Sequence, residues 1–250
     1  MAEKSAGKPS YWAVTREPRY ALALVLPMMA AYQVGLIVLA HLGQKTYEVR
    51  NAADLFLENV LGVSGVGGQI ASGAAVIGVL VGWQVLWRQA WGIRFLYVGG
   101  MLLEALFCAL VLLLSYRLAT GLFRQVPLTA GGSIRGLAGQ LMLSLGAGVY
   151  EEFLFRLLLI GCLTYLLRWA RAGRVSSAVV ASLVAAVTWS LFHMVGEEGW
   201  EALAPLTFLV RASAGLVFAG LFFGRGFGVT TATHALFNVI RILLDLVGPS

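Results

Sequence analysis

The sequence predicts an all-α fold, a polytopic transmembrane helical bundle of about seven spans (six to eight). The first observation behind this is composition. Hydrophobic residues fill 59% of the 250 positions and charged residues 12%, about half of the roughly 25% charged residues in soluble proteins. The second is that long apolar runs recur along the chain with polar or basic segments between them. Such runs are expected to cross a bilayer as helices, because helices pair their own backbone polar groups.

The apolar runs give the predicted spans in order. The first carries Pro27, which a membrane helix tolerates, and the second ends in Trp83 and Trp87, which suit the membrane–water interface. The fourth is too long for one perpendicular crossing, so we expect it to tilt, protrude or bend near Gly146-Ala147-Gly148. Residues 52–61 are predicted to form a short interfacial helix. The predicted spans are 20–42, 70–86, 96–114, 136–167, 175–194, 205–223 and 229–247.

The chain divides into an N-terminal tail (1–19), N-terminal transmembrane helices and loops (20–133), and a core that holds most of the intramembrane polar residues (134–250). The tail is basic and no cleavable signal peptide is evident, so the first span is expected to be an uncleaved anchor. The majority of basic loops favour a cytoplasmic N-terminus and put the acidic loop 197–201 outside, against one loop with Arg117, Arg124 and Arg135. We expect a multi-pass protein of a bacterial inner membrane.

The net charge of +6 reflects the basic loops that membrane orientation requires. Nucleic acid is therefore not an expected partner, whereas the lipid bilayer is. Cys108 and Cys162 both lie within apolar spans, so neither a disulfide nor a cysteine metal motif is predicted.

The stretch Tyr150-Glu151-Glu152-Phe153-Leu154-Phe155-Arg156 places three ionisable side chains inside an apolar run. Each costs about 2.5–3.5 kcal/mol at the bilayer centre on insertion scales, so partners and a function are expected. Glu152 and Arg156 are four residues apart on one helical face and can form an ion pair. Glu151 is rotated by about 100° from Glu152 and is left free for another role.

Further polar residues lie in later spans. His193 closes the segment 189–193, and His234 and Asn238 are four residues apart on one helical face. Their side chains can hydrogen-bond one object. Since packing in a membrane gives no cheap reason to keep so many polar groups, we expect them to share a site with Glu151.

Three motifs in this order, Glu-Glu-x-x-x-Arg (151–156), aromatic-x-x-x-His (189–193) and His-x-x-x-Asn (234–238), resemble the CAAX prenyl protease and bacteriocin-processing (CPBP, or Abi) family of intramembrane proteases. The resemblance covers roughly residues 134–247 and makes 134–250 the expected catalytic core. Trp189 is a departure, because the family's second motif usually has Phe there. We expect this difference to affect only local packing.

The resemblance implies an intramembrane endopeptidase that hydrolyses a peptide bond of a membrane-associated protein or peptide, near one of its termini. Glu151 is similar to the base that activates a water molecule, and His193 to the residue that holds that water. His234 and Asn238 are similar to the groups that stabilise the oxyanion. Glu152 and Arg156 resemble structural support. Elementary chemistry agrees, since hydrolysis needs a base and donors aimed at the developing oxyanion.

A metal is not required by this scheme, and we favour a metal-free site. The chain lacks an HExxH motif, and its two relevant histidines lie on different spans. Zinc held by Glu151, His193 and His234 as a His₂Glu set is the alternative.

Functions other than proteolysis also use residues of these kinds. A non-catalytic CPBP-like membrane scaffold or immunity factor would not need all four of Glu151, His193, His234 and Asn238, which this chain keeps. A proton-coupled transporter would also use intramembrane ionisable residues, but no pair of related halves is visible. The segment Gly62-Val63-Ser64-Gly65 resembles a rhomboid nucleophile box, and its glycine-rich setting favours a plain turn.

Overall fold

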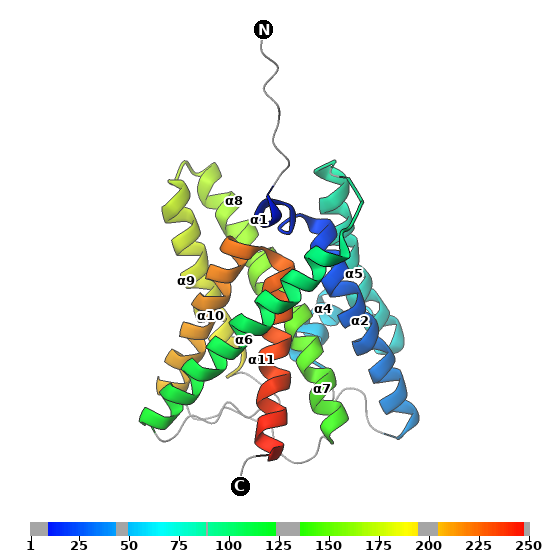
Figure 1. Cartoon of the computed structure of the whole chain (residues 1–250). Helices are drawn as coiled ribbons and strands as arrows, with labels where there is room; N and C mark the ends of the chain where they lie inside the picture. Colours follow the sequence, from blue (N-terminus) through cyan, green and yellow to red (C-terminus); the bar gives the residue numbers. More distant parts are fainter. Residues whose placement is uncertain (1–9, 44–49, 89, 124–135, 195–204, 248–250) are drawn as a thin grey trace.

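The computed structural model describes residues 10–43, 50–88, 90–123, 136–194 and 205–247, and over these residues it is helical without strands (Figure 1). Six of the described helices are long and apolar enough to cross a membrane. A seventh crossing is made by four consecutive segments that are helical throughout 137–169. The all-α, polytopic fold is thus confirmed. The six helices are α2 (Pro18–His41), α5 (Gly65–Leu86), α6 (Phe95–Phe123), α9 (Arg174–Phe192), α10 (Pro205–Arg225) and α11 (Phe227–Val247).

The predicted spans agree with the helices except at some ends. Helix α5 begins at Gly65 and α6 ends at Phe123, whereas the apolar runs suggested 70 and 114. A helix does not have to end where hydrophobicity falls, because its backbone hydrogen bonds continue outside the hydrocarbon layer. The basic residues Lys4 and Lys8, the acidic loop 197–201, Arg124 and Arg135 lie outside the described residues.

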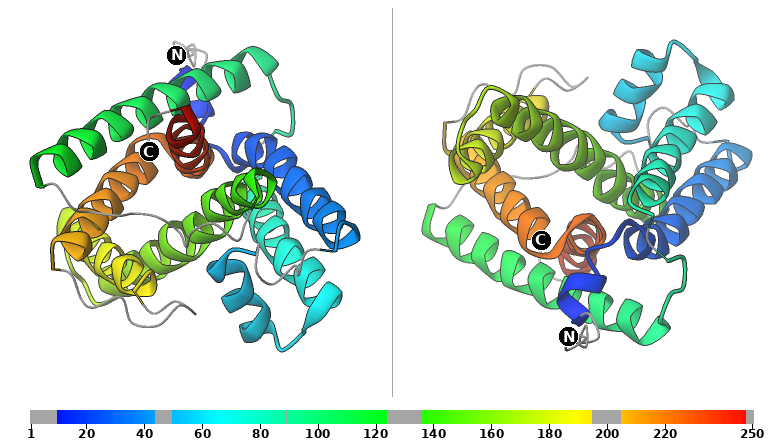
Figure 2. Two further views of the ribbon diagram at one scale, coloured as in Figure 1. Left: turned by 90° about the horizontal axis from the view of Figure 1, so that it is seen from below. Right: turned by 90° about the horizontal axis from the view of Figure 1, so that it is seen from above.

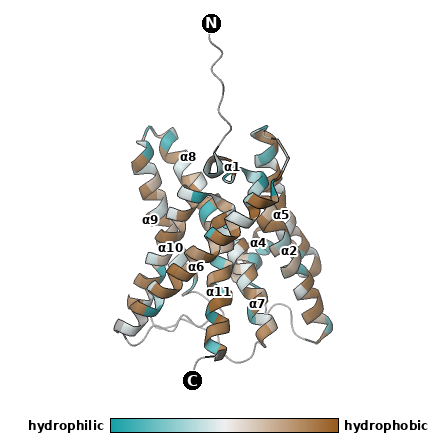
Figure 3. Cartoon of the chain, viewed as in Figure 1, coloured by the Kyte–Doolittle hydropathy of each residue, from teal (hydrophilic) through white to brown (hydrophobic). Residues whose placement is uncertain are grey.

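The helices are grouped around the seventh crossing (Figure 2). Helices α2, α4 and α5 lie on one side of it, α9 and α10 lie on the other, and α6 packs along α11. Apolar side chains cover the outward faces of the spans, and hydrophilic residues gather at the upper ends of α5, α8 and α9 (Figure 3). This distribution is expected of helices that face lipid.

The seventh crossing contains a widened helix. It consists of α7 (Leu137–Gly146), η1 (Ala147–Glu151), η2 (Phe153–Ile160) and α8 (Gly161–Trp169). The η segments are π-helical, with one extra residue per hydrogen-bonded turn, and such segments often occur at functional sites. The bend expected near residues 146–148 therefore takes the form of a change in helix type at Ala147, and the two adjacent glutamates lie within it.

Close packing against α11 explains a glycine in this region. A Cβ on Gly148 would lie 2.7 Å from Cβ of Ala235 and 2.9 Å from the carbonyl oxygen of Thr231. Only a glycine lets η1 approach α11 this closely. The contact brings Glu151 next to the part of α11 that carries His234.

The turn between α10 and α11 is set deeper in the molecule than the turn between α8 and α9 (Figure 1). The short helix α1 (Tyr11–Val14) lies over it. Arg16 donates to the carbonyl oxygen of Phe223 at 2.7 Å, and Arg225 contacts Glu104 at 2.6 Å. If all spans simply crossed the membrane side by side, His193 and His234 would lie near opposite membrane faces and could not share a site. Because α11 starts deeper in the molecule, His234 is displaced toward the depth of His193, and neither α9 nor α11 is broken.

Helix α4 (Ala52–Leu61) has the bounds predicted for a short helix, but its orientation differs from that of an interfacial helix. Asp54 and Glu58 are buried, whereas Phe56 and Val60 are exposed. A helix on a membrane surface turns its charged face to water, whereas α4 turns its charged face inward. It packs against α5 and η1, beside the middle of the bundle.

Buried polar partners hold α4 in this orientation. Asp54 accepts hydrogen bonds from the Tyr32 hydroxyl at 2.8 Å, from Nε of Arg50 at 2.8 Å, and from Ser72. Arg50 also contacts Glu58. Since ionised groups at membrane depth need partners, this cluster explains why the charged face of α4 can lie inside the bundle.

Candidate active site

Glu151 contacts residues from several helices. Its side chain is buried at the end of η1. Oε1 accepts a hydrogen bond from Nδ2 of Asn51 at 2.9 Å, and Oε2 accepts one from Nε1 of Trp189 at 2.7 Å. Glu151, which the helical spacing predicts not to pair with Arg156, is therefore held by two neutral donors from other segments of the chain.

Both candidate imidazoles face the same oxygen. Nε2 of His193 lies 3.5 Å from Oε2 of Glu151, and Nε2 of His234 lies 4.0 Å from it. His193 follows the last residue of α9, and its ring contacts that of Trp189 at a centroid distance of 4.7 Å. The ring of His234 is stacked on Phe218. The structure thus brings His193 and His234 together beside Glu151.

The tautomer of His193 follows from the hydrogen bond of Nδ1, the ring nitrogen that does not face Glu151. Nδ1 of His193 lies 3.0 Å from the carbonyl oxygen of Trp189, which can only accept. Nδ1 therefore carries the proton, and in the neutral ring Nε2 is an acceptor. Since Oε2 of Glu151 is also an acceptor, two proton acceptors face each other across 3.5 Å. A donor such as a water molecule can satisfy both.

Glu152 points to a different set of partners. Its Oε1 lies 3.2 Å from Nη1 of Arg156, which is the ion pair predicted from the four-residue spacing, and 2.7 Å from Nδ1 of His234. Arg156 is 1% exposed and lies over the rings of Trp189 at 4.9 Å and Phe218 at 5.3 Å. Glu152 thus supports Arg156, as expected, and also orients a site histidine.

Asn238 lies one helical turn after His234 on α11 and is partly buried. In the described part of the chain it makes no hydrogen bond to another side chain. Its predicted role as an oxyanion donor stays a prediction.

The donor types suit zinc. Two imidazoles and a carboxylate form a common catalytic zinc set, and metal-bound histidines usually donate their other N–H to a carbonyl or carboxylate, as both rings do here. Within the described residues, however, no group of three His, Cys, Asp or Glu side chains has the spacing of a metal site. Glu151, His193 and His234 would have to move closer together to hold the ion.

Two contacts of Glu151 were missed from the sequence. Trp189 was noted only as a departure from a motif, with consequences for packing. Asn51 precedes the predicted helix 52–61, and its Oδ1 does accept a hydrogen bond from the backbone N–H of Ala53, as an N-cap does. Its second contact joins residues 100 positions apart, for which the sequence has no local signal.

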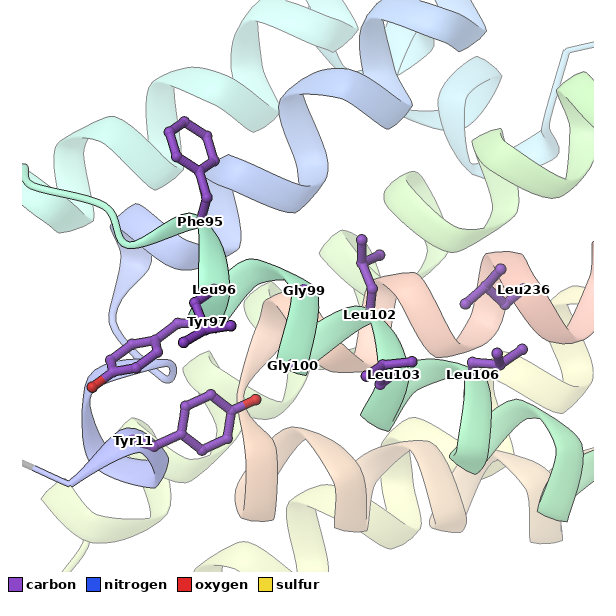
Figure 4. Close-up of a pocket in the computed structure, with 10 residues that line it drawn as sticks. All are labelled: Tyr11, Phe95, Leu96, Tyr97, Gly99, Gly100, Leu102, Leu103, Leu106 and Leu236. Carbon is purple, nitrogen blue, oxygen red and sulfur yellow. The ribbon is translucent and has the colours of Figure 1, made fainter.

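Other candidates are not at this site. Ser64 is exposed in the turn between α4 and α5, where Gly62 and Gly65 both have a φ of +68°. Cys108 and Cys162 are free thiols. A pocket of about 970 Å³ opens between α1, α6 and α11 (Figure 4). Its lining is apolar and contains none of the candidate catalytic residues: Tyr11, Phe95, Leu96, Tyr97, Gly99, Gly100, Leu102, Leu103, Leu106 and Leu236.

A match to a known family lies in the same part of the chain as the site motifs. Residues 133–240 match the family described as Type II CAAX prenyl endopeptidase Rce1-like. The predicted resemblance is thereby confirmed. The Rce1-like match includes Glu151, His193, His234 and Asn238 but not Asn51. Neither the curated proteins nor the solved structures compared with the chain gave a match. The Rce1-like stretch supports, in general terms, a CAAX-type intramembrane endopeptidase.

Proposed function

We propose that this protein is an intramembrane endopeptidase in which Glu151 activates the attacking water. The observation that supports this most is the pair of facing acceptors. Oε2 of Glu151 and Nε2 of His193 are 3.5 Å apart, and in these protonation states no proton lies between them. A water molecule that donates to both has its oxygen lone pairs directed away from them, toward a substrate carbonyl carbon.

In the proposed reaction, Glu151 first accepts a proton and later donates it. Glu151 takes a proton from the water as the water oxygen bonds to the carbonyl carbon. The C–N bond then breaks, and the leaving nitrogen takes that proton from Glu151. His193 holds the water, and its Nδ1–H stays on the Trp189 carbonyl. The second proton of the water stays on the oxygen bound to the carbonyl carbon, so the products are a carboxylic acid, which then ionises, and a new amine terminus.

The oxyanion needs donors. Asn238 would supply its amide N–H. His234 would supply Nε2–H in its doubly protonated form, because its Nδ1–H is already directed at Glu152. Glu152 lies next to that ring and next to Arg156, and the two glutamates together offset the two positive charges. The second carboxylate is thus part of the electrostatic support of the site rather than a second base.

A metal is not needed for these steps. If a zinc ion is bound, Glu151, His193 and His234 would hold it, and it would polarise the water as a Lewis acid.

The substrate in this proposal is a membrane-associated protein or peptide that is cleaved near a terminus. Basic residues flank three neighbouring connections: Arg16 precedes α2, Arg88 and Arg94 lie between α5 and α6, and Arg168 and Arg171 lie where α8 is followed by α9. These connections are at the end of the bundle that carries α1 (Figure 1). By the positive-inside rule this end is cytoplasmic. A bacterial inner membrane is the proposed location.

Terminal proteomics tests the function. Membranes from cells with the wild-type protein are compared with membranes from cells with Glu151→Gln, and substrates should keep a terminal segment only in the variant. Purified wild-type protein in vesicles should then cleave a peptide taken from that segment, and Glu151→Gln should not. Equal terminal fragments in both strains, or cleavage of the peptide by the purified variant, would contradict the proposal.

A further inference from the structure

The two neutral donors on Glu151 come from opposite sides of the seventh crossing. Asn51 precedes α4, and Trp189 lies in the last turn of α9. Asn51 binds Oε1 at 2.9 Å and Trp189 binds Oε2 at 2.7 Å. Each oxygen of the carboxylate therefore has one donor of its own, and rotation of the carboxylate would break both hydrogen bonds.

The direction of each hydrogen bond is unambiguous. An indole nitrogen can only donate. The amide of Asn51 cannot be flipped without loss, because its Oδ1 accepts from the backbone N–H of Ala53 at 2.9 Å, which leaves Nδ2 for Glu151. Both oxygens of Glu151 must therefore be acceptors. This is the form that a general base needs before it takes a proton.

Asn51 is itself fixed in place at membrane depth. Its backbone N–H donates to the hydroxyl of Tyr32 at 3.2 Å, and this hydroxyl donates to Asp54. The rings of Tyr32 and Tyr150 are in contact at a centroid distance of 5.6 Å, and Tyr150 precedes Glu151 in the chain. The buried charged face of α4 thus has a consequence beyond packing, since it holds a donor against the candidate base.

Trp189 is held just as firmly. Its ring contacts the guanidinium of Arg156 at 4.9 Å, and its centroid lies 4.7 Å from that of His193 and 5.9 Å from that of His234. The carbonyl oxygen of the same residue accepts from His193. One residue therefore sets the position of Oε2 through its side chain and the tautomer of His193 through its backbone.

We propose that Asn51 and Trp189 are positioning residues that together fix the Glu151 carboxylate with Oε2 directed between the two imidazoles. The proposal rests on the proposed role of Glu151 as the base. It also means that the site is completed by a residue from outside the stretch that matches the Rce1-like family.

The indole N–H can be tested without changing the packing. Replacement of Trp189 by 3-benzothienylalanine keeps the size and flat shape of the side chain and puts sulfur in place of the N–H. We expect kcat on the peptide identified by terminal proteomics to fall on the order of tenfold to a hundredfold, as for a misplaced catalytic group. KM should stay within about twofold, and the thermal midpoint should fall only by the loss of one buried hydrogen bond. Trp87→Phe, at an exposed tryptophan, is the control.

For Asn51 the cap and the contact with Glu151 can be separated. Asn51→Ser keeps a good N-cap but is too short to reach Glu151, so kcat per folded molecule should fall, while the thermal midpoint should fall only by the loss of one buried hydrogen bond. Asn51→Asp also keeps the cap, and its carboxylate would repel Glu151, so it should be slower than Asn51→Ser. Asn59→Ser, at an exposed position of the same helix, is the control.

The outcomes separate this proposal from the proposed function. Wild-type kcat in both the benzothienylalanine variant and Asn51→Ser, with Glu151→Gln inactive, would overturn the positioning role and leave the function intact. A fall in activity that follows only the loss of folded protein would also overturn it. Cleavage by Glu151→Gln would instead contradict the function.

Discussion

Nδ1 of His234 lies 2.7 Å from Oε1 of Glu152, so the two adjacent glutamates contact different nitrogen atoms of the site imidazoles. Glu151 faces Nε2 of both histidines, whereas Glu152 holds one ring from behind. Neighbouring carboxylates in one helix can differ in this way because they point to different sides. Their variants should therefore fail for different reasons.

Glu152→Gln should destabilise the protein. The substitution leaves Arg156, which is 1% exposed, without its anion, and breaking such buried pairs costs about 3–5 kcal/mol. Thermal unfolding in detergent should show a clearly lower midpoint and lower yield. Activity per folded molecule should fall as well, because His234 loses its acceptor.

Glu151→Gln is the matched comparison. Its two hydrogen-bond donors, Asn51 and Trp189, are neutral, so neither becomes an unpaired charge, and one unmatched donor costs about 1–3 kcal/mol. The variant should insert, purify and unfold closer to the wild type while cleaving nothing. Identical stability and identical residual activity in the two variants would remove the basis for separate roles.

Gly148→Ala should push α11 away from the seventh crossing. The new Cβ would meet backbone atoms of α11 at 2.9 Å and 3.0 Å, which cannot move as a flexible side chain does, and overpacking of this kind costs about 1–3 kcal/mol. Because His234 directly precedes the contacted Ala235, kcat should drop too. Gly161→Ala, in the same crossing with nothing near its Cβ, should keep activity and stability. Equal effects of the two would contradict the packing argument.

Asp54→Asn should weaken the attachment of α4. Asp54 is fully buried and shares Arg50 with Glu58, so the variant should lose thermal stability and also kcat, through Asn51. Asp245→Asn removes an exposed partner of Arg117 and should change stability by less than about 1 kcal/mol. A stable Asp54→Asn protein with full activity would show that the cluster does not hold the site.

The sequence was sufficient for features that depend on local periodicity. The spans followed from apolar runs, α4 from its short pattern, and the Glu152–Arg156 pair from a four-residue spacing. It was insufficient where distant segments meet. The contact of Asn51 with Glu151 depends on how α4 packs, and the N–H of Trp189 matters only because α9 ends beside η1. The π-helical stretch was also not predictable, since its wider hydrogen-bond pattern follows from tertiary packing rather than from composition.

Cleavage should not depend on a metal ion. In the proposed reaction Glu151 and His193 act on water directly, so cleavage should survive exhaustive chelation, and the purified protein should contain much less than one zinc per chain by elemental analysis. The groups that could bind a metal already have other partners or roles. Oε2 of Glu151 accepts the N–H of Trp189, and His234 and Asn238 lie one turn apart, which suits two donors on one oxyanion. Asn238→Ala should accordingly lower kcat about a hundredfold or more, as loss of one oxyanion donor does, with little change in thermal stability.

A zinc site would give different results. It is the alternative because Nδ1 of each imidazole already has a carbonyl or carboxylate acceptor, as in a zinc site. Activity that is lost with a chelator and restored by one equivalent of Zn²⁺, together with an Asn238→Ala variant that keeps most of its rate, would replace the metal-free mechanism by a His₂Glu zinc site.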